Sequence, residues 1–201
     1  MGSLSKHNLG TYILKHGLTS FAETGLYKGE GLEYAASFPE FTSLVSIDIE
    51  QKWYELGIEK FNCDPRITIL LGDSIFMIEE MLDTLDGPTL WWLDAHLPES
   101  HIGGGDPTFE GNKIYGGLTT FPLESELRDI GQLRDFSSDV FIIDDLRIYE
   151  DADYRWGSWK KEQKARYTDP GASTFIDEIL GKTHNIERSL DDHGYAVAEP
   201  K

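Results

Sequence analysis

Acidic and imidazole side chains follow one apolar segment of the sequence and can do acid-base chemistry. Asp94 and His96 come directly after the apolar run from Thr89 to Leu93. An unperturbed imidazole has a pKa of about 6.5, so His96 is a candidate general base near neutral pH. A single histidine is often structural, but a position so close to Asp94 favours a catalytic role for both residues.

Two adjacent aspartates follow another apolar segment. Asp144 and Asp145 come directly after the run from Val140 to Ile143. Neighbouring carboxylates repel each other unless a cation or hydrogen-bond donors lie close by. Together with Asp94 they can supply three oxygen ligands to Mg2+ or Ca2+. Arg147 offers a local alternative, because its charge can neutralise the pair without a metal.

A glycine-containing segment from Phe21 to Gly31 connects an apolar run to an amphipathic one. Gly25 and Gly29 let the backbone turn tightly and approach a ligand. Their spacing departs from the G-x-G-x-x-G pattern of dinucleotide-binding folds. Glu23, at the end of the apolar run, would repel a pyrophosphate and suits a cationic ligand. The segment therefore favours a cofactor loop for a cation.

Two further acids follow the next apolar segments along the chain. Asp48 can accept hydrogen bonds from the hydroxyls of a ribose, whereas Glu50 suits the start of the following helix. Asp73, followed by Ser74, can accept a hydrogen bond from an adenine amino group or cap the next helix. Acids at three successive strand ends predict a site for a nucleoside cofactor.

Apolar β-rich runs alternate with amphipathic segments, as in a parallel sheet covered by helices. We expect one Rossmann-like α/β domain over residues 1–201, a three-layer sandwich whose mostly parallel seven-stranded sheet ends in an antiparallel hairpin. Long connections at 95–120 and 146–172 are expected to be active-site loops. The expected strands are 20–23, 43–48, 66–71, 89–93, 140–143, 184–190 and 195–198, and the expected helices are 29–37, 51–61, 74–85, 122–134 and 173–180.

Glu23-Thr24-Gly25, the acidic second strand and Gly72-Asp73-Ser74 resemble the cofactor motifs of class I S-adenosylmethionine-dependent methyltransferases. The resemblance covers most of the chain. It implies that Glu23 and Gly25 border the methionine part, Asp48 the ribose and Asp73 the adenine. The cofactor residues implied are Glu23, Thr24, Gly25, Gly29, Asp48, Asp73, Ser74 and Asp94.

Within that superfamily, Glu-Thr-Gly with Asp94 and Asp144-Asp145 is similar to macrocin-type sugar O-methyltransferases. The similarity implies a divalent metal, such as Mg2+, on these three aspartates. His96 stands where that pattern has a second acid. We expect O-methylation of a hydroxylated small molecule, a sugar or a glycosylated metabolite. The alternatives are an NAD(P)-dependent oxidoreductase and a non-catalytic protein that binds S-adenosylmethionine.

Composition limits the partners of the chain. A formal net charge of −18 argues against binding to nucleic acid phosphates. Short apolar runs, a polar start and a single cysteine, Cys63, predict a cytoplasmic protein with no membrane contact. Aromatic residues after Asp145, namely Tyr149, Tyr154, Trp156 and Trp159, can form a lid or pack onto the domain or onto a second subunit, as in a homodimer. His101 and Glu126 are weaker candidates for the site.

Overall fold

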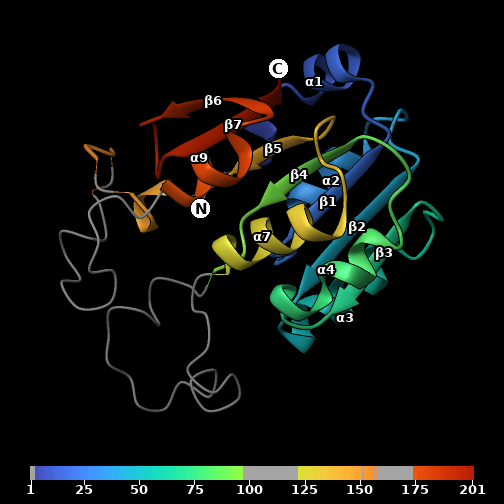
Figure 1. The fold of residues 1–201 in the computed structure, drawn as a ribbon. Coiled ribbons are helices and arrows are strands. Elements are labelled where there is room, and N and C mark those ends of the chain that lie inside the picture. The colour runs from blue at the N-terminus through green and yellow to red at the C-terminus, as the bar shows by residue number, and fades with distance from the viewer. Residues whose placement is uncertain (1–2, 97–121, 151, 156, 158–173) are drawn as a thin grey trace.

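A computed structural model of the chain describes residues 3–96, 122–150, 152–155, 157 and 174–201. Seven strands form one sheet in the order β3-β2-β1-β4-β5-β7-β6 (Figure 1). The strands are β1 (Ser20–Thr24), β2 (Ser43–Asp48), β3 (Ile67–Leu71), β4 (Thr89–Leu93), β5 (Val140–Ile143), β6 (His184–Ser189) and β7 (Tyr195–Pro200). The helices are η1 (Leu4–Lys6), α1 (Leu9–His16), α2 (Glu30–Ala36), α3 (Gln51–Phe61), α4 (Ser74–Leu82), α7 (Leu123–Leu133), η2 (Leu146–Ile148) and α9 (Thr174–Leu180).

The predicted fold class is confirmed. Strands β1 to β5 pair in parallel, whereas β7 pairs antiparallel with β5 and with β6. The chain therefore forms a mostly parallel seven-stranded sheet with a C-terminal antiparallel hairpin. The expected helix 74–85 is shorter, because Asp83 caps α4 and Thr84 and Leu85 turn away from the helical pattern. The sequence analysis did not predict η1, α1 or η2.

Both faces of the sheet are buried, which explains the apolar strands. In Figure 1, α4, α7 and α9 cover the face of the sheet toward the viewer. Their apolar side chains, including Ile78, Leu127 and Ile176, pack with Ala22 of β1 in one core cluster. On the other face, α1 and α2 pack with Phe21, the residue that precedes Ala22, in a second cluster. Alternate residues of β1 therefore point to opposite cores.

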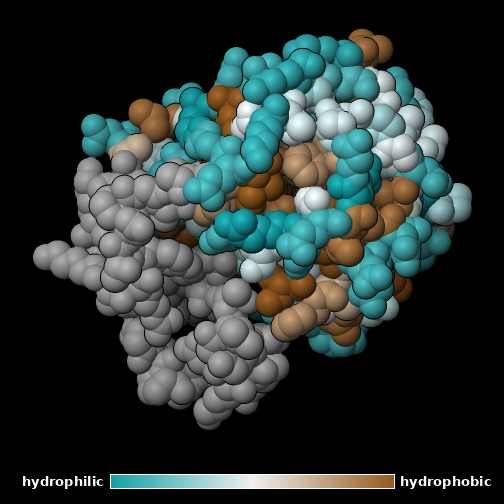
Figure 2. Space-filling view, in the orientation of Figure 1, coloured by the Kyte–Doolittle hydropathy of each residue, from teal (hydrophilic) through white to brown (hydrophobic). Residues whose placement is uncertain are grey.

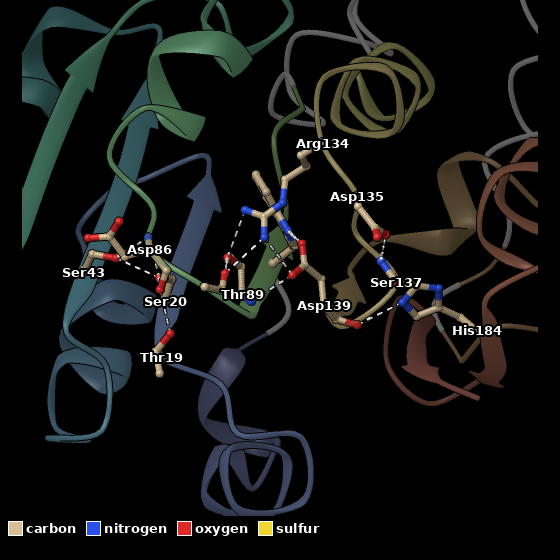
Figure 3. Close-up of polar contacts among 12 residues, drawn as sticks. Thr19, Ser20, Ser43, Asp86, Thr89, Arg134, Asp135, Ser137, Asp139 and His184 are labelled. Atoms are coloured by element: carbon tan, nitrogen blue, oxygen red, sulfur yellow. Dashed lines mark hydrogen bonds and ion pairs between the residues drawn. The ribbon is translucent and has the colours of Figure 1, made fainter.

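A polar network at the amino ends of the strands holds β4 to the loop before β5 (Figure 3). Asp139 is fully buried and accepts hydrogen bonds from the Thr89 amide at 2.9 Å and from the Trp91 indole at 3.0 Å. Arg134 pairs with the same carboxylate at 3.1 Å. Burial raises the pKa of Asp139 to about 6 although these partners favour its charged form. Hydrogen bonds and an ion pair within the protein therefore join the amino end of β4 to the loop before β5.

Hydrophilic and hydrophobic residues are interspersed on the face seen in Figure 2. No helix in the described ranges is long and apolar enough to cross a bilayer.

We predict that Asp139→Asn lowers the free energy of unfolding by about 2–4 kcal/mol, because the partly buried Arg134 loses its counter-ion and one of the buried oxygen acceptors becomes a donor. Urea denaturation at neutral pH measures the change. Asp135→Asn is the control, since Asp135 is exposed and its hydrogen bonds come from the nearby Ser137; it should cost less than about 1 kcal/mol. An equal decrease in the free energy of unfolding in the two variants would show that the contacts of Asp139 do not stabilise the fold.

Candidate active site

The predicted site residues lie along the carboxyl ends of the parallel strands. β1 lies between β2 and β4, so the chain reverses its direction of travel across the sheet between β1 and β4. Such a switch point leaves room for a ligand beyond the strand ends. The Asp94 amide donates to the Thr24 carbonyl at 3.2 Å and ties the two strand ends together. Glu23, Thr24 and Asp94 therefore meet at the switch point.

The glycine loop is held close to both neighbouring strands. Gly25 has a φ of 93°, and a Cβ added there would lie 3.1 Å from the Asp94 carbonyl oxygen. Its amide donates to the Ile47 carbonyl at 3.0 Å. Gly29 also has a positive φ and caps α2, where a Cβ would meet the Phe61 ring. Gly25 is thus required at the strand end, and Gly29 serves the packing of the helix that follows.

Asp48 anchors this loop. Its Oδ2 accepts from the Tyr27 amide at 2.8 Å, and its Oδ1 accepts from the Glu50 amide at 2.9 Å. Tyr27 needs this support because its φ is 48°. Burial raises the pKa of Asp48 against these hydrogen bonds. A carboxylate has about four acceptor positions, so Asp48 keeps acceptor capacity for a ligand beside these amides. Glu50 begins α3 as its N-cap, as predicted, and is exposed.

The two roles left open for Asp73 can now be compared. Asp73 is the N-cap of α4 and accepts from the Ile75 amide at 3.2 Å. Helix capping is therefore present, while its partly exposed side chain keeps further acceptor positions. Ser74 is buried and donates to Glu126 Oε1 at 2.5 Å, which brings α7 to the start of α4. Glu126 is thus part of the site region and does not face solvent.

Glu23 lies where the sequence placed it, but its charge is suppressed. Its side chain is buried against α2, where a Cβ on Gly31 would collide with Oε1. Its Oε2 accepts from the Ser46 hydroxyl at 2.6 Å. Burial raises its pKa to about 8, a rise that Ser46 opposes and that the nearby Asp48 reinforces. Repulsion of a pyrophosphate by a Glu23 carboxylate therefore does not follow at neutral pH.

Asp94 and Asp144, on the next two strand ends, each have a carboxylate oxygen without a hydrogen bond among the described residues, although His96 Nε2 lies 3.7 Å from Asp94 Oδ1. These oxygens, Asp94 Oδ1 and Asp144 Oδ2, are both buried. Burial, and then the charge of Asp144, raise the pKa of Asp94 well above its usual value. Burial likewise raises the pKa of Asp144, to about 6. These oxygens call for a donor or cation from outside the protein.

Asp145 is compensated by the protein itself. His96 Nε2 lies 2.6 Å from Asp145 Oδ2, and His193 Nδ1 lies 2.8 Å from Oδ1. The Arg147 Nε is 3.5 Å from the same Oδ1. Burial raises the pKa of Asp145, but the two imidazoles outweigh burial and hold it below its usual value. The alternative of local neutralisation by Arg147 is supported, with His96 and His193 added.

His193 was not predicted as a site residue. It lies in the turn before β7, and its carbonyl accepts from the Arg147 amide at 3.0 Å. The antiparallel hairpin returns the chain to the carboxyl edge, so a residue late in the sequence reaches Asp145. The motif Asp191-Asp192-His193-Gly194 indicated only a tight turn, and hairpin direction is the signal that could have placed His193 at the site.

The side chains that lie close enough to share a metal ion differ from the predicted set of Asp94, Asp144 and Asp145. Among the described residues, the group with ligand atoms within 4.8 Å of one another is Asp94, His96 and Asp145, with His96 in place of Asp144. Asp145 has a left-handed backbone, φ 52° and ψ 41°, which turns the chain directly after Asp144. The orphaned oxygens fit a cation at Asp94 and Asp144, whereas Asp145 already has cationic neighbours.

Two of the four aromatic residues singled out after Asp145 lie in the core of the domain. Tyr149 and Tyr154 are buried at 6% and 5% exposure and belong to the core cluster with α9. Packing onto the domain is therefore their role. Trp156, Trp159 and His101 lie outside the described residues, as does most of the predicted loops 95–120 and 146–172.

A sheet of this order, with an antiparallel last strand and a glycine loop at the switch point, is the class I methyltransferase fold. Solved structures with that fold cover nearly the whole chain. An S-adenosylhomocysteine-bound methyltransferase of Podospora anserina has a TM-score of 0.53 and 14% identity over 95% of this chain and 75% of that one. An O-methyltransferase of Bacillus cereus in complex with S-adenosylhomocysteine has a TM-score of 0.54 and 15% identity over 96% and 79%.

A putative rRNA methylase of Clostridium thermocellum is similar in length as well, with a TM-score of 0.54 and 15% identity over 97% of this chain and 98% of that one. No family model and no curated protein matches the sequence. At these identities the likeness shows the fold. The resemblance to the class I methyltransferase superfamily is therefore confirmed at the level of fold, and macrocin-type specificity stays a prediction.

We predict that Glu23→Gln becomes more stable than the wild type as the pH rises. The folded-state pKa of about 8 exceeds the unfolded value of 4.5, so the native state binds more protons between these pH values and its stability falls with rising pH. The difference in unfolding free energy between variant and wild type should grow by on the order of 3 kcal/mol from pH 5 to pH 8.

Urea denaturation at pH 5, 6.5 and 8 measures this difference. Glu30→Gln, at an exposed position in the same loop, is the matched control and should show no comparable growth. A constant difference for Glu23→Gln across the pH range would show that Glu23 is not protonated in the native state.

Proposed function

We propose that this protein is an S-adenosylmethionine-dependent methyltransferase acting on a hydroxyl group of a small molecule, such as a sugar or a glycosylated metabolite. The observation that carries the proposal is the Gly25 turn anchored by Asp48 at the switch point between β1 and β4. Two solved structures of the same fold, from Podospora anserina and Bacillus cereus, contain S-adenosylhomocysteine. The donor would place its methionine part at Thr24 and Gly25, its ribose at Asp48 and its adenine near Asp73.

Charge supports a cationic donor. Burial raises the pKa values of Asp94 and Asp144, which means that their ionised forms lack compensation. A sulfonium close to these carboxyls would stabilise the ionised form. Lysines do lie at the glycine loop: Lys28 belongs to it and stacks on the Tyr27 ring, and Lys60 donates to the Lys28 and Gly29 carbonyls. The dinucleotide alternative is instead disfavoured by the spacing of the glycines, which departs from the G-x-G-x-x-G pattern.

His96 is the proposed base. Asp145 holds His96 Nε2, so Nδ1 is the atom that would accept the proton of the acceptor hydroxyl. The acceptor oxygen then bonds to the methyl carbon, the carbon–sulfur bond breaks, and S-adenosylhomocysteine leaves as a neutral thioether. Alignment of oxygen, carbon and sulfur supplies most of the rate enhancement, because the sulfonium is already an activated donor.

A divalent cation belongs to this proposal as an additional component. Asp94 and Asp144 would hold it through the oxygens that have no partner among the described residues. When bound, such a cation lowers the pKa of a coordinated hydroxyl and offsets the acidic charge. A cytoplasmic location, a small-molecule acceptor in place of nucleic acid, and a homodimer remain proposals from the sequence.

The donor assignment predicts that Asp48→Asn weakens S-adenosylhomocysteine binding about 10- to 100-fold, because the variant loses both a ribose acceptor and the Tyr27 anchor. Titration calorimetry measures the affinity. Glu50→Gln, on the exposed neighbouring residue, is expected to change it less than about threefold. A wild-type protein that binds neither S-adenosylmethionine nor S-adenosylhomocysteine would refute the proposed function.

The metal assignment predicts that Mg2+ or Mn2+ raises the Tm of the wild type, because a ligand that binds only the native state stabilises it. Asp94→Asn and Asp144→Asn should lose the shift, whereas Asp129→Asn on the outer part of α7 should keep it. Activity should fall with EDTA and return with Mg2+. Full activity in EDTA and no shift in Tm would remove the metal from the proposal.

A further inference from the structure

Glu126 is a buried acid to which the roles above assign no function. It lies in the first turn of α7 and is 1% exposed. The same helix carries Glu124, which is exposed and pairs with Arg128 at 2.8 Å across one helical turn. One acid of this turn thus faces solvent and a cation, and the other points into the protein, where its hydrogen-bond partner is the Ser74 hydroxyl. The burial of the Glu126 carboxyl group therefore needs a reason that does not apply to Glu124.

Two elements, α4 and β1, bring polar side chains to Glu126. Ser74, the first residue of α4, donates to Glu126 Oε1 at 2.5 Å. Thr24, the last residue of β1, acts on the same carboxyl, and the two hydroxyls lower its pKa while burial raises it to about 7. Alternation along β1 explains the arrangement, because Thr24 points to the same face as Ala22, toward α4 and α7, whereas Glu23 points to α2.

The Thr24 hydroxyl is an independent sign of a missing ligand. Thr24 is fully buried, and its Oγ1 forms no hydrogen bond of normal geometry with any described residue, Glu126 included. Buried hydroxyls nearly always have a partner, so an exception needs a reason such as an absent ligand. The next residue is Gly25, at the turn of the cofactor loop, and the Thr24 carbonyl already accepts from the Asp94 amide. The unpartnered oxygen therefore lies at the switch point.

We propose that Thr24 and Glu126 form the subsite for the α-ammonium group of the methyl donor, with Ser74 as the residue that positions Glu126. The inference rests on the proposed methyl-donor function and names which residues hold its amino-acid part. An ammonium has three donors and no acceptor, which suits a hydroxyl oxygen and a carboxylate. It also supplies the positive charge that Glu126 lacks, so donor binding draws a proton from Glu126 when the pH is near or below neutrality.

Two probes separate recognition of the ammonium from general damage to the site. S-adenosylhomocysteine carries the ammonium, whereas 5′-methylthioadenosine lacks the whole amino-acid part. In titration calorimetry, Glu126→Gln should weaken S-adenosylhomocysteine about 10- to 100-fold and change 5′-methylthioadenosine less than about threefold. At pH 6.5 the wild type should also release part of a proton on binding S-adenosylhomocysteine, seen from buffers of different ionisation enthalpy, and the variant should release less.

Glu124→Gln is the matched control, since it removes the same charge from the same turn of α7, and both affinities should stay within about threefold. Thr24→Val tests the subsite without replacing Glu126. It removes a hydroxyl that forms no hydrogen bond of normal geometry with a described residue, so the Tm of the ligand-free protein should change little, while S-adenosylhomocysteine should bind about 10-fold more weakly.

Equal weakening of both probes by Glu126→Gln, or no weakening of either, would overturn the proposal. If Glu126→Gln does not fold, Thr24→Val decides, and unchanged S-adenosylhomocysteine affinity in that variant would overturn it. A wild-type protein that binds 5′-methylthioadenosine and S-adenosylhomocysteine equally well also overturns the ammonium subsite but keeps the proposed function. A wild type that binds neither probe refutes both.

Discussion

Burial of carboxyl groups at the ends of β1, β2, β4 and β5 is the constraint on which this site depends. Helices cover both faces of these strands, so an acid at a strand end loses its water and must find a donor, a cation or a proton. Asp48 accepts hydrogen bonds from the backbone amides of Tyr27 and Glu50. Asp145 is contacted by the imidazoles of His96 and His193 and by Arg147. Glu23 instead has a pKa of about 8 and keeps its proton at neutral pH. The same local problem thus has three different solutions within one edge of the sheet.

The fold could be predicted from the sequence because apolar runs typical of strands alternate regularly with amphipathic segments typical of helices. Strands buried on both faces are continuous apolar runs, so β2, β4 and β5 have the predicted bounds. α1 was missed although Leu9 and Ile13 are four residues apart and Gly17 ends the helix in a left-handed conformation. Short elements of this kind depend on the core that they cover, because eight residues make a marginal helix alone.

The positions of the site residues could also be predicted, whereas their electrostatic states could not. Acids at strand ends follow from the parallel order of the strands. Whether such an acid is charged depends on side-chain direction and on partners that are distant in sequence. Glu23 points toward Gly31 on α2, His193 reaches Asp145 from the last hairpin, and Glu126 turns inward on a helix whose Glu124 faces water. No spacing in the sequence encodes these three directions.

Alternation along β1 also divides the chemistry between two faces. Glu23 and Thr24 are neighbours in sequence, yet Glu23 points to the core under α2 and Thr24 points to α4 and α7. A donor lying across the end of β1 would therefore contact acids on both faces of the sheet. The acids would then form two sets with separate roles. Glu126 would change its protonation state when the donor binds, and the group around Asp145 would respond to the acceptor. Because the carboxyls of the two sets lie on different elements, a substitution in one set can alter donor binding and leave the geometry around the proposed base intact.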